Sequence, residues 1–368
     1  MAGVYISYPF CAQKCTYCNF ASGVFPRALE AGYLDGLRHE LGKTEWAWTP
    51  ETVYLGGGTP SLMGPAALAD LLAAIPGKPW REATMEAAPG DITSEMASAW
   101  CRAGINRVSL GVQSFNKREL ARTGRKHTAE IVQREVAILR AAGIGNFNID
   151  LIAGLPGQTL ESWNASLDWV ERLESPHVSV YMLEVDEDSR LGSEVLAFGK
   201  RYGAPDIPSD DQIADFYEIA VDRLAHAGIP RYEISNFARP GFESRHNLKY
   251  WRREPYLGFG ADAHSFDGTW RWQNPESMEE YLRGTKPERT PADAAAEPFF
   301  LGLRLDRGID REMDVDWSAH QPAVERFIRG GLLESSGNIL RLTRRGVLLS
   351  NEVFAEFLSP SSYDRSAK

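Results

Sequence analysis

Short runs rich in β-branched and aromatic residues alternate with segments of helical periodicity through the first half of the chain. The expected strands are VYISY (4–8), TVYL (52–55), ATMEAA (83–88), RVSLGVQS (107–114), NFNIDLIAG (146–154) and HVSVYML (177–183). Apolar residues recur at helical spacing in segments 27–43, 65–75, 91–104, 129–143 and 160–173. Strands that alternate with helices predict parallel β/α units with right-handed crossovers. The predicted fold class is therefore α/β, as a doubly wound sheet or as a complete or partial barrel.

Either architecture places a functional site at the carboxyl ends of the strands. The unusual polar and glycine-rich stretches occur at these ends. GGGTP (56–60) follows the second expected strand, Glu86 lies in the third, and Gln113 is near the end of the fourth. Asp150 and the segment GLPGQT (154–159) belong to the fifth. The sequence thus predicts a site at this edge of the sheet.

The second half of the chain has a different character. A helix is expected at 210–229, and the following stretch is rich in aromatic residues, glycine and turn formers. From residue 291 onward a helix, a turn, a short hairpin and another helix predict a small winged-helix-like domain. We therefore divide the chain into a core (1–230), an aromatic and basic extension (231–290) and a small α+β C-terminal domain (291–368).

Charge and hydrophobicity exclude several classes of function. The chain has 40 basic and 50 acidic residues, a balance of −10 that does not favour nucleic-acid binding. No stretch approaches the roughly 18 apolar residues of a membrane span, and the N-terminus lacks the features of a signal peptide. We expect a soluble cytoplasmic protein. In a reducing compartment, clustered cysteines are typical of metal or redox sites rather than disulfides.

Three of the four cysteines are clustered within eight residues, at Cys11, Cys15 and Cys18. Three soft ligands on one loop suit an iron–sulfur cluster or zinc. A structural zinc site generally needs four protein ligands, and the other candidates, His39 and Cys101, are expected in helices. Three ligands without a fourth favour a cluster with one open iron, although a zinc loop remains an alternative.

The segment YPFCAQKCTYC resembles the signature of the radical S-adenosylmethionine superfamily. The resemblance implies a partial (β/α)6 barrel and a 4Fe-4S cluster held by Cys11, Cys15 and Cys18. It also implies that S-adenosylmethionine binds the open iron and is cleaved to a 5′-deoxyadenosyl radical, with the protein supplying geometry and water exclusion. Tyr5 and Tyr17 are among the aromatic residues expected to enclose this site.

The same resemblance assigns further residues to S-adenosylmethionine. The implied set is Tyr5, Tyr17, Gly57, Gly58, Thr59, Glu86, Gln113, Arg125 and Asp150. The GGGTP segment is expected to offer backbone amides at close approach, because glycine lacks a Cβ. A carboxylate can accept from the ammonium or ribose groups, and Arg125 can pair with a carboxylate. GFGADA (258–263) fits a dinucleotide fingerprint, but no clear strand and helix are expected around it, so we interpret it as a turn.

The resemblance covers residues 4 to 360. It points to the group that contains oxygen-independent coproporphyrinogen III oxidase and its HemW-type heme chaperone relatives. The segments that carry it are YPFCAQKCTYCNF, GGGTPS, SLGVQSF, NIDLIAGLPGQT, YEISNFA, RHNLKYW and LTRRGVLLSNEVFAEFL. The oxidase has a further cysteine two residues after the third, where this chain has Phe20. Only ten residues precede Cys11, whereas the oxidase begins with a longer segment. Both departures favour the chaperone.

The segment HNLKYW (246–251) matches a motif typical of the heme chaperones. The resemblance implies heme binding by His246, Asn247, Tyr250 and Trp251. Histidine is an axial ligand for heme iron, and the two aromatic rings offer a flat apolar surface. Nearby cations could pair with the propionates: Arg245, Lys249, Arg252 and Arg253. The alternative is a structural aromatic loop. His127 is expected to be a cap or a wall of the site, and the role of His264 is open.

We therefore expect a heme chaperone that carries heme to acceptor hemoproteins, such as respiratory enzymes, and receives electrons from a flavodoxin or ferredoxin. The deoxyadenosyl radical could make or break a bond between protein and heme, or the cluster could act as a structural or redox gate. An alternative is the decarboxylation of coproporphyrinogen III propionates in porphyrin biosynthesis. A zinc-stabilised binding module is a third possibility.

Overall fold

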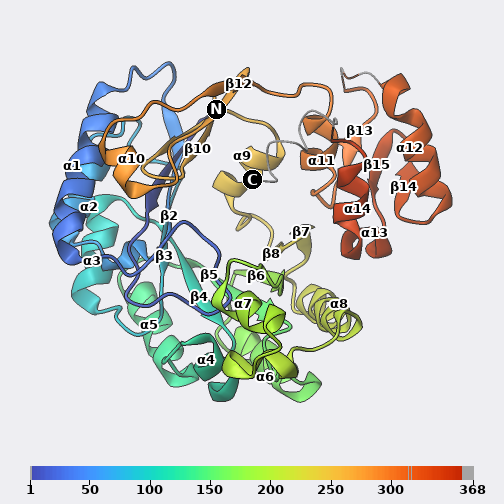
Figure 1. Ribbon diagram of the computed structural model, residues 1–368, viewed down its shortest axis with the longest axis horizontal. Coiled ribbons are helices and arrows are strands. Elements are labelled where there is room, and N and C mark those ends of the chain that lie inside the picture. Colours follow the sequence, from blue (N-terminus) through green and yellow to red (C-terminus); the bar gives the residue numbers. More distant parts are fainter. Residues whose placement is uncertain (1, 314, 316, 359–368) are drawn as a thin grey trace.

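The computed structural model describes residues 2–313, 315 and 317–358. Its centre is one curved sheet in which six parallel strands follow one another in chain order (Figure 1). These strands are β1 (Ala2–Tyr8), β2 (Pro50–Gly57), β3 (Glu82–Ala87), β4 (Arg107–Gln113), β5 (Asn146–Ala153) and β6 (His177–Met182). All six expected strands are present, and the bounds differ from the sequence prediction by at most two residues. The α/β fold class with a partial (β/α)6 barrel is confirmed.

Helices cover the outer face of this sheet (Figure 1). They are α1 (Arg27–Lys43), α2 (Pro65–Ala73), α3 (Ser94–Ala103), α4 (Lys117–Thr123), α5 (Ala129–Ala141), α6 (Leu160–Arg172) and α8 (Asp210–His226), with the short turn η1 (Pro60–Leu62). Helix α4 was not predicted. It is a separate seven-residue helix that begins at the Asn116 cap and ends at Gly124, whose φ is 85°. The capping chemistry of an asparagine and a glycine was the available signal.

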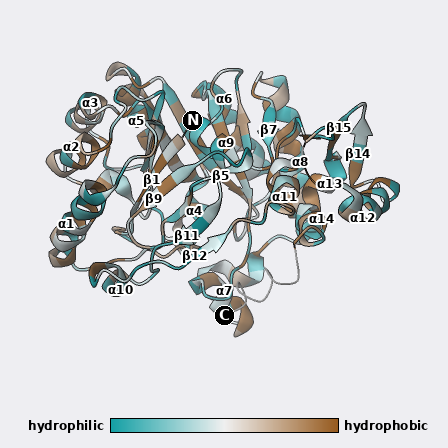
Figure 2. Cartoon of the chain, turned by 90° about the horizontal axis from the view of Figure 1, so that it is seen from above, coloured by the Kyte–Doolittle hydropathy of each residue, from teal (hydrophilic) through white to brown (hydrophobic). Residues whose placement is uncertain are grey.

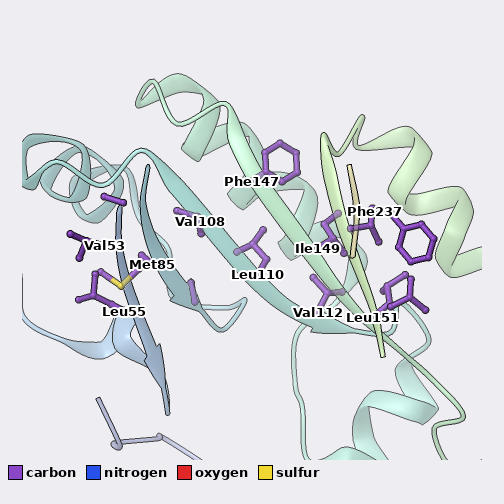
Figure 3. Close-up of a cluster of buried hydrophobic side chains, with 14 of the residues drawn as sticks. Val53, Leu55, Met85, Val108, Leu110, Val112, Phe147, Ile149, Leu151 and Phe237 are labelled. Carbon is purple, nitrogen blue, oxygen red and sulfur yellow. The ribbon is translucent and has the colours of Figure 1, made fainter. Parts of the chain in front are cut away.

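The hydrophobic core lies between the strands and these helices. Every second residue of the parallel strands is apolar and buried there. Figure 3 labels nine of these side chains, together with Phe237 of the antiparallel strand β8: Val53, Leu55, Met85, Val108, Leu110, Val112, Phe147, Ile149 and Leu151. Figure 2 shows hydrophobic residues concentrated on the central strands and mixed colouring on the surrounding helices. The alternate strand residues, which face the inside of the barrel, are mostly polar and form the site described below. Strands of a parallel sheet are usually apolar along nearly their whole length. The alternation seen here therefore indicates a polar interior of the barrel.

The region after α8 extends the sheet at both edges. On one side β7 (Arg231–Glu233) and β8 (Asn236–Ala238) are antiparallel neighbours of β6. On the other side β9 (Tyr256–Phe259) lies parallel to β1 and is followed by β10 (His264–Phe266), β11 (Trp270–Gln273) and β12 (Arg289–Pro291). The sheet thus has twelve strands among the described residues.

GFGADA was expected to lack a clear preceding strand, and this was wrong, because its first two residues are the end of β9. It continues into strand β10 and not into a helix. The interpretation as a turn holds.

Three further helices lie outside the regular β/α units. They are α7 (Arg190–Leu196), α9 (Arg245–Trp251) and α10 (Met278–Leu282), with the short helical turn η2 (Arg201–Asp206). Helix α9 contains HNLKYW and lies between the two edges of the curved sheet (Figure 1).

The C-terminal part is a small unit beside the barrel. It comprises α11 (Glu297–Gly302), β13 (Ile309–Asp310), α12 (Trp317–Arg329), β14 (Leu333–Ser336), β15 (Ile339–Leu342), α13 (Arg344–Leu348) and α14 (Ser350–Ala355). Its three strands form a separate antiparallel sheet with β15 in the middle. A hairpin flanked by helices agrees with the expected winged-helix-like arrangement. The division of the chain at residues 230 and 290 remains a prediction.

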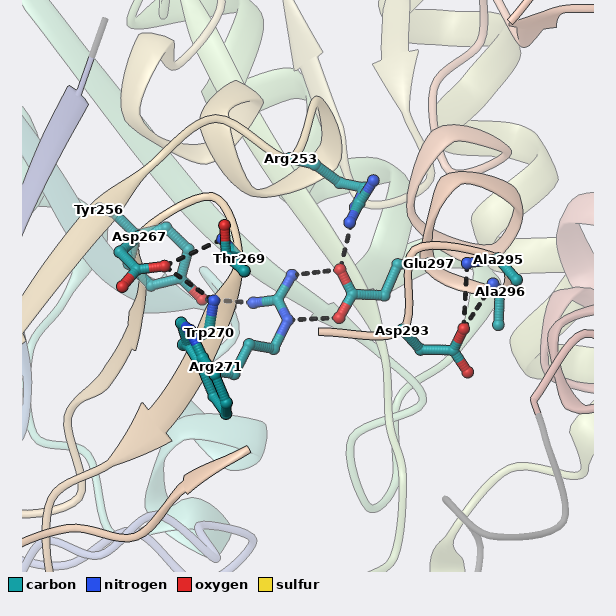
Figure 4. A network of polar contacts seen from close by, with 10 residues as sticks. All are labelled: Arg253, Tyr256, Asp267, Thr269, Trp270, Arg271, Asp293, Ala295, Ala296 and Glu297. Carbon is teal, nitrogen blue, oxygen red and sulfur yellow. Dashed lines mark hydrogen bonds and ion pairs between the residues drawn. The ribbon is translucent and has the colours of Figure 1, made fainter. Parts of the chain in front are cut away.

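An ion-pair network joins this unit to the barrel (Figure 4). The Glu297 carboxylate on α11 accepts from the Arg271 guanidinium at 2.5 and 2.8 Å and from Arg253 Nε at 2.9 Å. Arg271 also donates to the Tyr256 hydroxyl of β9 at 3.2 Å. Burial acts to raise the pKa of Glu297, but the ion pairs with Arg271 and Arg253 outweigh it and lower the pKa. The C-terminal unit is therefore held through a buried carboxylate.

No helix among the described residues is long and apolar enough to span a bilayer.

Candidate functional site

The loop that carries the three cysteines leaves the carboxyl end of β1. Cys11 N donates to Gly23 O at 2.9 Å, and Gly23 N donates back to Pro9 O at 2.9 Å, so the base of the loop is closed by backbone bonds. Thr16 N donates to Thr123 O at the end of α4. Cys11, Cys15 and Cys18 are free thiols and partly buried. The loop is thus held on both sides with three thiols available.

The surroundings of the loop fit an anionic, sulfur-rich group. The side chains of Tyr17 and Arg125 lie beside the Cys15 thiol and interact with it electrostatically. Burial raises the pKa of the Cys18 thiol. Among the described residues, no three His, Cys, Asp or Glu side chains are grouped closely enough to hold a single metal ion. Three thiols on one loop fit the ligands that an iron–sulfur cluster with one open iron requires.

The GGGTP segment is pressed against the start of the cysteine loop. Gly58 N donates to Tyr8 O at 2.8 Å, and Thr59 N donates to Phe10 O at 2.9 Å. A Cβ at Gly58 would lie 2.7 Å from Phe10 O, so only glycine fits there. Gly57 has a φ of 101°, which also favours glycine. We expected the amides of this segment to be open to a ligand. That was wrong for Gly58 and Thr59, whose amides donate to the end of β1 and to the start of the cysteine loop instead.

Glu86 and Asp150 lie inside the barrel on β3 and β5. The Tyr54 hydroxyl donates to Glu86 at 2.8 Å, and Asn148 Nδ2 donates to Asp150 at 2.6 Å. The Ser109 hydroxyl donates to Asp150 at 3.2 Å. Burial, together with the charge of Asp150, raises the pKa of Glu86 to about 7. Burial likewise raises the pKa of Asp150. The negative charge of Asp150 thus disfavours the ionisation of Glu86, whereas a cationic group bound beside Glu86 would favour it.

Gln113 and Arg125 meet over the backbone of Gly111. A Cβ at Gly111 would lie 3.1 Å from Gln113 Nε2 and 3.4 Å from an Arg125 guanidinium nitrogen. Arg125 donates to Gly111 O at 2.8 Å, and its Nε has no partner among the described residues. Gln113 has a φ of 70°, an unusual backbone conformation for a residue other than glycine.

His127 is buried nearby, and burial lowers its pKa to about 4. The cap of α5 is Thr128, so His127 is not a cap.

The aromatic residues near the loop have different environments. Tyr5 stacks on Tyr54 inside the barrel, with ring centroids 6.1 Å apart. Tyr8 and Phe10 are buried, and Phe10 packs against Tyr33 of α1. Phe20 is 65% exposed. Tyr5 and Tyr17 thus face the candidate site, whereas Tyr8 and Phe10 belong to the packing outside it.

The HNLKYW helix lies at the opposite ends of the strands. His246 Nδ1 is 2.9 Å from the hydroxyl of Thr52, near the start of β2, and its Nε2 is 2.8 Å from the Tyr250 hydroxyl. At about 3.3 Å per residue, the step from Thr52 to Gly57 places the two regions about 16 Å apart along β2. His246 is fully buried, and burial lowers its pKa to about 3. Neither ring nitrogen is free to bind an iron in this arrangement.

Buried charges hold α9 against the barrel. The Glu82 carboxylate of β3 accepts from Arg245 N and His246 N, each at 2.9 Å, and thereby caps the helix. Lys249 is buried and pairs with Glu51 at 2.5 Å and with Glu254 at 3.0 Å.

The other members of the motif are more accessible than His246. Asn247, Tyr250 and Trp251 are partly exposed, and Arg245 and Arg252 are exposed. Trp251 is covered on one face by the Arg304 guanidinium, 4.3 Å from the ring centroid. His264 is exposed on β10, beside Gln273 of β11. Of the four cations expected to face propionates, Lys249 and Arg253 are already in ion pairs.

Several interior polar residues were not singled out from the sequence. Arg107, Asn148 and His177 lie on the inner face of β4, β5 and β6 and are buried. His177 binds the Asn148 amide oxygen at 2.7 Å and the Tyr232 hydroxyl at 2.9 Å. The available signal was the alternation of polar and apolar residues in RVSLGVQS and NFNIDLIA, which indicates an inner polar face.

Comparison with known proteins agrees with this geometry. A model of the radical SAM superfamily matches residues 5–170, and a model of the HemN C-terminal domain matches residues 290–349. Proteins named heme chaperone HemW from Lactococcus lactis and Bacillus subtilis are each 34% identical to this chain. The alignments cover 96% of both chains for the first, and 97% of this chain and 99% of the relative for the second. The Mycobacterium tuberculosis protein of that name is 37% identical over 97% of this chain and 94% of its own.

Among solved structures, coproporphyrinogen III oxidase (HemN) from Escherichia coli has the same fold. The TM-score is 0.82 at 23% sequence identity, over 97% of this chain and 89% of that one. Because the HemW relatives align over nearly their whole length, the chain belongs to the HemW family of radical S-adenosylmethionine proteins.

Proposed function

We propose that this protein is a heme chaperone that binds heme and transfers it to acceptor hemoproteins, using a 4Fe-4S cluster and S-adenosylmethionine. One observation carries the proposal. Three free thiols lie on the loop after β1, where Arg125 interacts with Cys15 and donates to Gly111 O of β4, in a chain whose full-length relatives are named heme chaperones.

Cys11, Cys15 and Cys18 would hold the cluster, and its open iron would bind S-adenosylmethionine. When bound, the cluster supplies one electron for reductive cleavage of the sulfonium, a reaction that no side chain performs. Arg125, which interacts with Cys15, would balance the negative charge of the bound cluster. The buried ends of β1 and β2, joined by the backbone bonds of Gly58 and Thr59, keep the loop at a fixed position.

The inner residues would orient S-adenosylmethionine. Glu86 and Asp150 are hydrogen-bond acceptors for its ammonium and ribose hydroxyl groups, and each is held in place by neighbours on its own or adjacent strands. Gln113 and Arg125 form a second wall over Gly111. Tyr5 and Tyr17 would exclude water from the region between them. Preorganised groups of this kind need no rearrangement at the moment of reaction.

For heme, the proposal rests on α9 and its accessible residues. Asn247, Tyr250 and Trp251 offer partly exposed polar and aromatic surface. Ligation by His246 would require the imidazole to exchange its bonds with Thr52 and Tyr250 for one with iron. We therefore propose that heme first contacts the outer residues of α9 and that His246 becomes available only if α9 moves.

The cellular setting forms part of the proposal. Heme acceptors such as respiratory hemoproteins, an electron donor such as flavodoxin or ferredoxin, a cytoplasmic location and a link to porphyrin biosynthesis all follow from the family resemblance. Their support is the HemW family membership and the candidate cluster site described above.

Transfer of heme to an apo-hemoprotein tests the function directly. Anaerobically purified protein with its cluster is loaded with hemin and mixed with an apo-hemoprotein such as apomyoglobin, and the Soret band of the acceptor is followed. We expect transfer from the loaded protein. A parallel incubation with coproporphyrinogen III and S-adenosylmethionine should yield no protoporphyrinogen. Formation of protoporphyrinogen without heme transfer would establish the oxidase activity in its place.

A further inference from the structure

Three neighbouring strands carry unsatisfied polar atoms on the inner face of the barrel. Thr84 of β3 is in register with Arg107 of β4, and Arg107 is in register with Asn146 of β5. Thr84 Oγ1, Arg107 Nε and Asn146 Oδ1 are all buried, and none has a hydrogen-bond partner among the described residues. Adjacent strands lie about 4.8 Å apart, so the three side chains form a short continuous row. Buried polar atoms normally have a partner, in protein, water or ligand.

Arg107 is the charged member of this row. Its side chain is 2% exposed, and no carboxylate of the described chain lies within ion-pair distance of it. It occupies the same face as Ser109, which contacts Asp150, so the guanidinium is directed into the barrel. A buried cation without a paired anion is costly. This position therefore calls for an anionic partner.

The nearby carboxylates are bound elsewhere. Glu82 caps α9 through Arg245 N and His246 N. Glu86 accepts from Tyr54, and Asp150 accepts from Asn148 and Ser109. The positive charge of Arg107 acts on Glu86 and Asp150. It partly offsets the rise in their pKa values that burial causes. None of them forms the direct bond that a buried guanidinium favours.

The row lies near α9. The charge of Arg107 also acts on His246 and on His177, which places all three groups in one region of the barrel. Two of the cations on or next to α9, Lys249 and Arg253, are already in ion pairs. A ligand with carboxylates that approaches α9 would thus find Arg107 as an unpaired buried cation.

We propose that Arg107, with Thr84, is a carboxylate-binding site inside the barrel and that it receives a propionate of the porphyrin. This inference rests on the proposed function. The guanidinium would donate two hydrogen bonds to the carboxylate, and the Thr84 hydroxyl would donate a third from the side. The site is closed in this structure, so entry requires α9 to move. Such a movement would also release His246 from Thr52.

A comparison of two porphyrins, with and without free propionates, distinguishes a propionate contact from general porphyrin binding. Hemin and hemin dimethyl ester, in which both propionates are esterified, are titrated into the full-length protein and followed by the Soret band. The variants are Arg107→Met, Arg107→Lys and Thr84→Val, with Arg102→Met on the exposed face of α3 as the matched control. Circular dichroism and thermal unfolding of each variant establish that it is folded.

A charge-assisted carboxylate contact corresponds to roughly 10- to 100-fold in affinity. We expect wild type and Arg102→Met to bind hemin tighter than the ester by that factor. Arg107→Met should bind both porphyrins equally, with the affinity for the ester unchanged. Arg107→Lys and Thr84→Val should show intermediate ratios. An unchanged ratio in Arg107→Met, or a loss equal for both porphyrins, would overturn the inference while leaving heme binding intact.

Failure of wild type to bind either porphyrin would instead overturn the proposed function. In that case, thermal unfolding in the presence of sodium propionate tests whether the row binds a carboxylate. Thermal stabilisation of wild type and of Arg102→Met, absent in Arg107→Met, would retain the carboxylate site with a different occupant. No difference between these proteins would show that only water fills the row.

Discussion

Thr52 and His246 are 194 residues apart in the chain and are joined by a 2.9 Å hydrogen bond between hydroxyl and Nδ1. This bond binds the helix that carries HNLKYW to the start of a central strand. The thiol-bearing loop leaves the opposite end of the neighbouring strand β1. The two regions predicted to handle heme and the cluster are therefore separated by the depth of the barrel. Any cooperation between them must pass through the polar residues of its interior.

The first prediction concerns the cysteine loop. Replacement of Cys11, Cys15 or Cys18 by serine should each remove most of the iron and sulfide from anaerobically purified protein, because a cluster with three protein ligands cannot tolerate the loss of one. The exposed Cys101 on α3 provides the matched control. Cys101→Ser should keep the full brown chromophore. Retention of iron and sulfide in all three loop variants would contradict the assignment.

The second prediction concerns His246. Replacement by alanine should lower the free energy of unfolding by about 2–4 kcal/mol, since it leaves a cavity and two buried hydroxyl groups without partners. Urea denaturation of the cluster-free protein measures this. The exposed His226 of α8 serves as the control, and His226→Ala should change stability little. A His246→Ala protein with unchanged stability and a lost Soret band would instead identify His246 as an axial ligand that the fold does not need.

The third prediction concerns the pH dependence of His246. Because burial lowers its folded-state pKa to about 3, the unfolded chain binds a proton near pH 6.5 that the folded chain does not. The stability contribution of the neutral imidazole is present above pH 6.5 and is lost as the pH falls toward 3. Unfolding titrations from pH 7 to pH 4 should show a shallower decline for His246→Gln than for wild type. A decline of equal slope in both proteins would refute this.

The fourth prediction concerns Glu86. With a pKa of about 7, its carboxylate is ionised in only a small fraction of molecules at pH 6 and in most at pH 7.5. If it accepts from the ammonium group of S-adenosylmethionine, affinity should rise about eightfold over that range. Isothermal titration with the cluster-loaded protein measures it. Glu86→Gln should bind more weakly and without this rise, whereas a persistent rise in the variant would assign the titration to another group.

The fifth prediction concerns the attachment of the C-terminal unit. Glu297→Gln removes a buried carboxylate that forms ion pairs with Arg253 and Arg271. It should destabilise the protein by about 3 kcal/mol at neutral pH. The exposed pair of Glu279 and Arg283 gives a control, and Glu279→Gln should have an effect below about 0.5 kcal/mol. Limited proteolysis between the barrel and α11 should become faster in Glu297→Gln alone. Equal proteolysis rates would show that packing, not the carboxylate, holds the unit.

Local sequence was sufficient to predict the β/α alternation and the cysteine loop. The periodicity of Arg27–Lys43 predicted α1 with the same bounds that the structure shows. The three cysteines are within eight residues of each other, so their proximity needs no tertiary information. Residues at the ends of parallel strands could also be placed together, because such strands share one direction. Glu86, Gln113 and Asp150 were found in this way.

The tertiary structure alone decided which ends of the strands α9 would contact. Strand β9 joins β1 across some 250 residues of chain, and Glu82 caps a helix that begins 163 residues later. These partners meet because burying a carboxylate, a histidine and a lysine is favourable only when all their bonds are satisfied at once, and no local pattern records that condition. The sequence by itself therefore determined the barrel and its thiol loop. Only the folded chain showed that His246 is enclosed and that Arg107 is left without an anion.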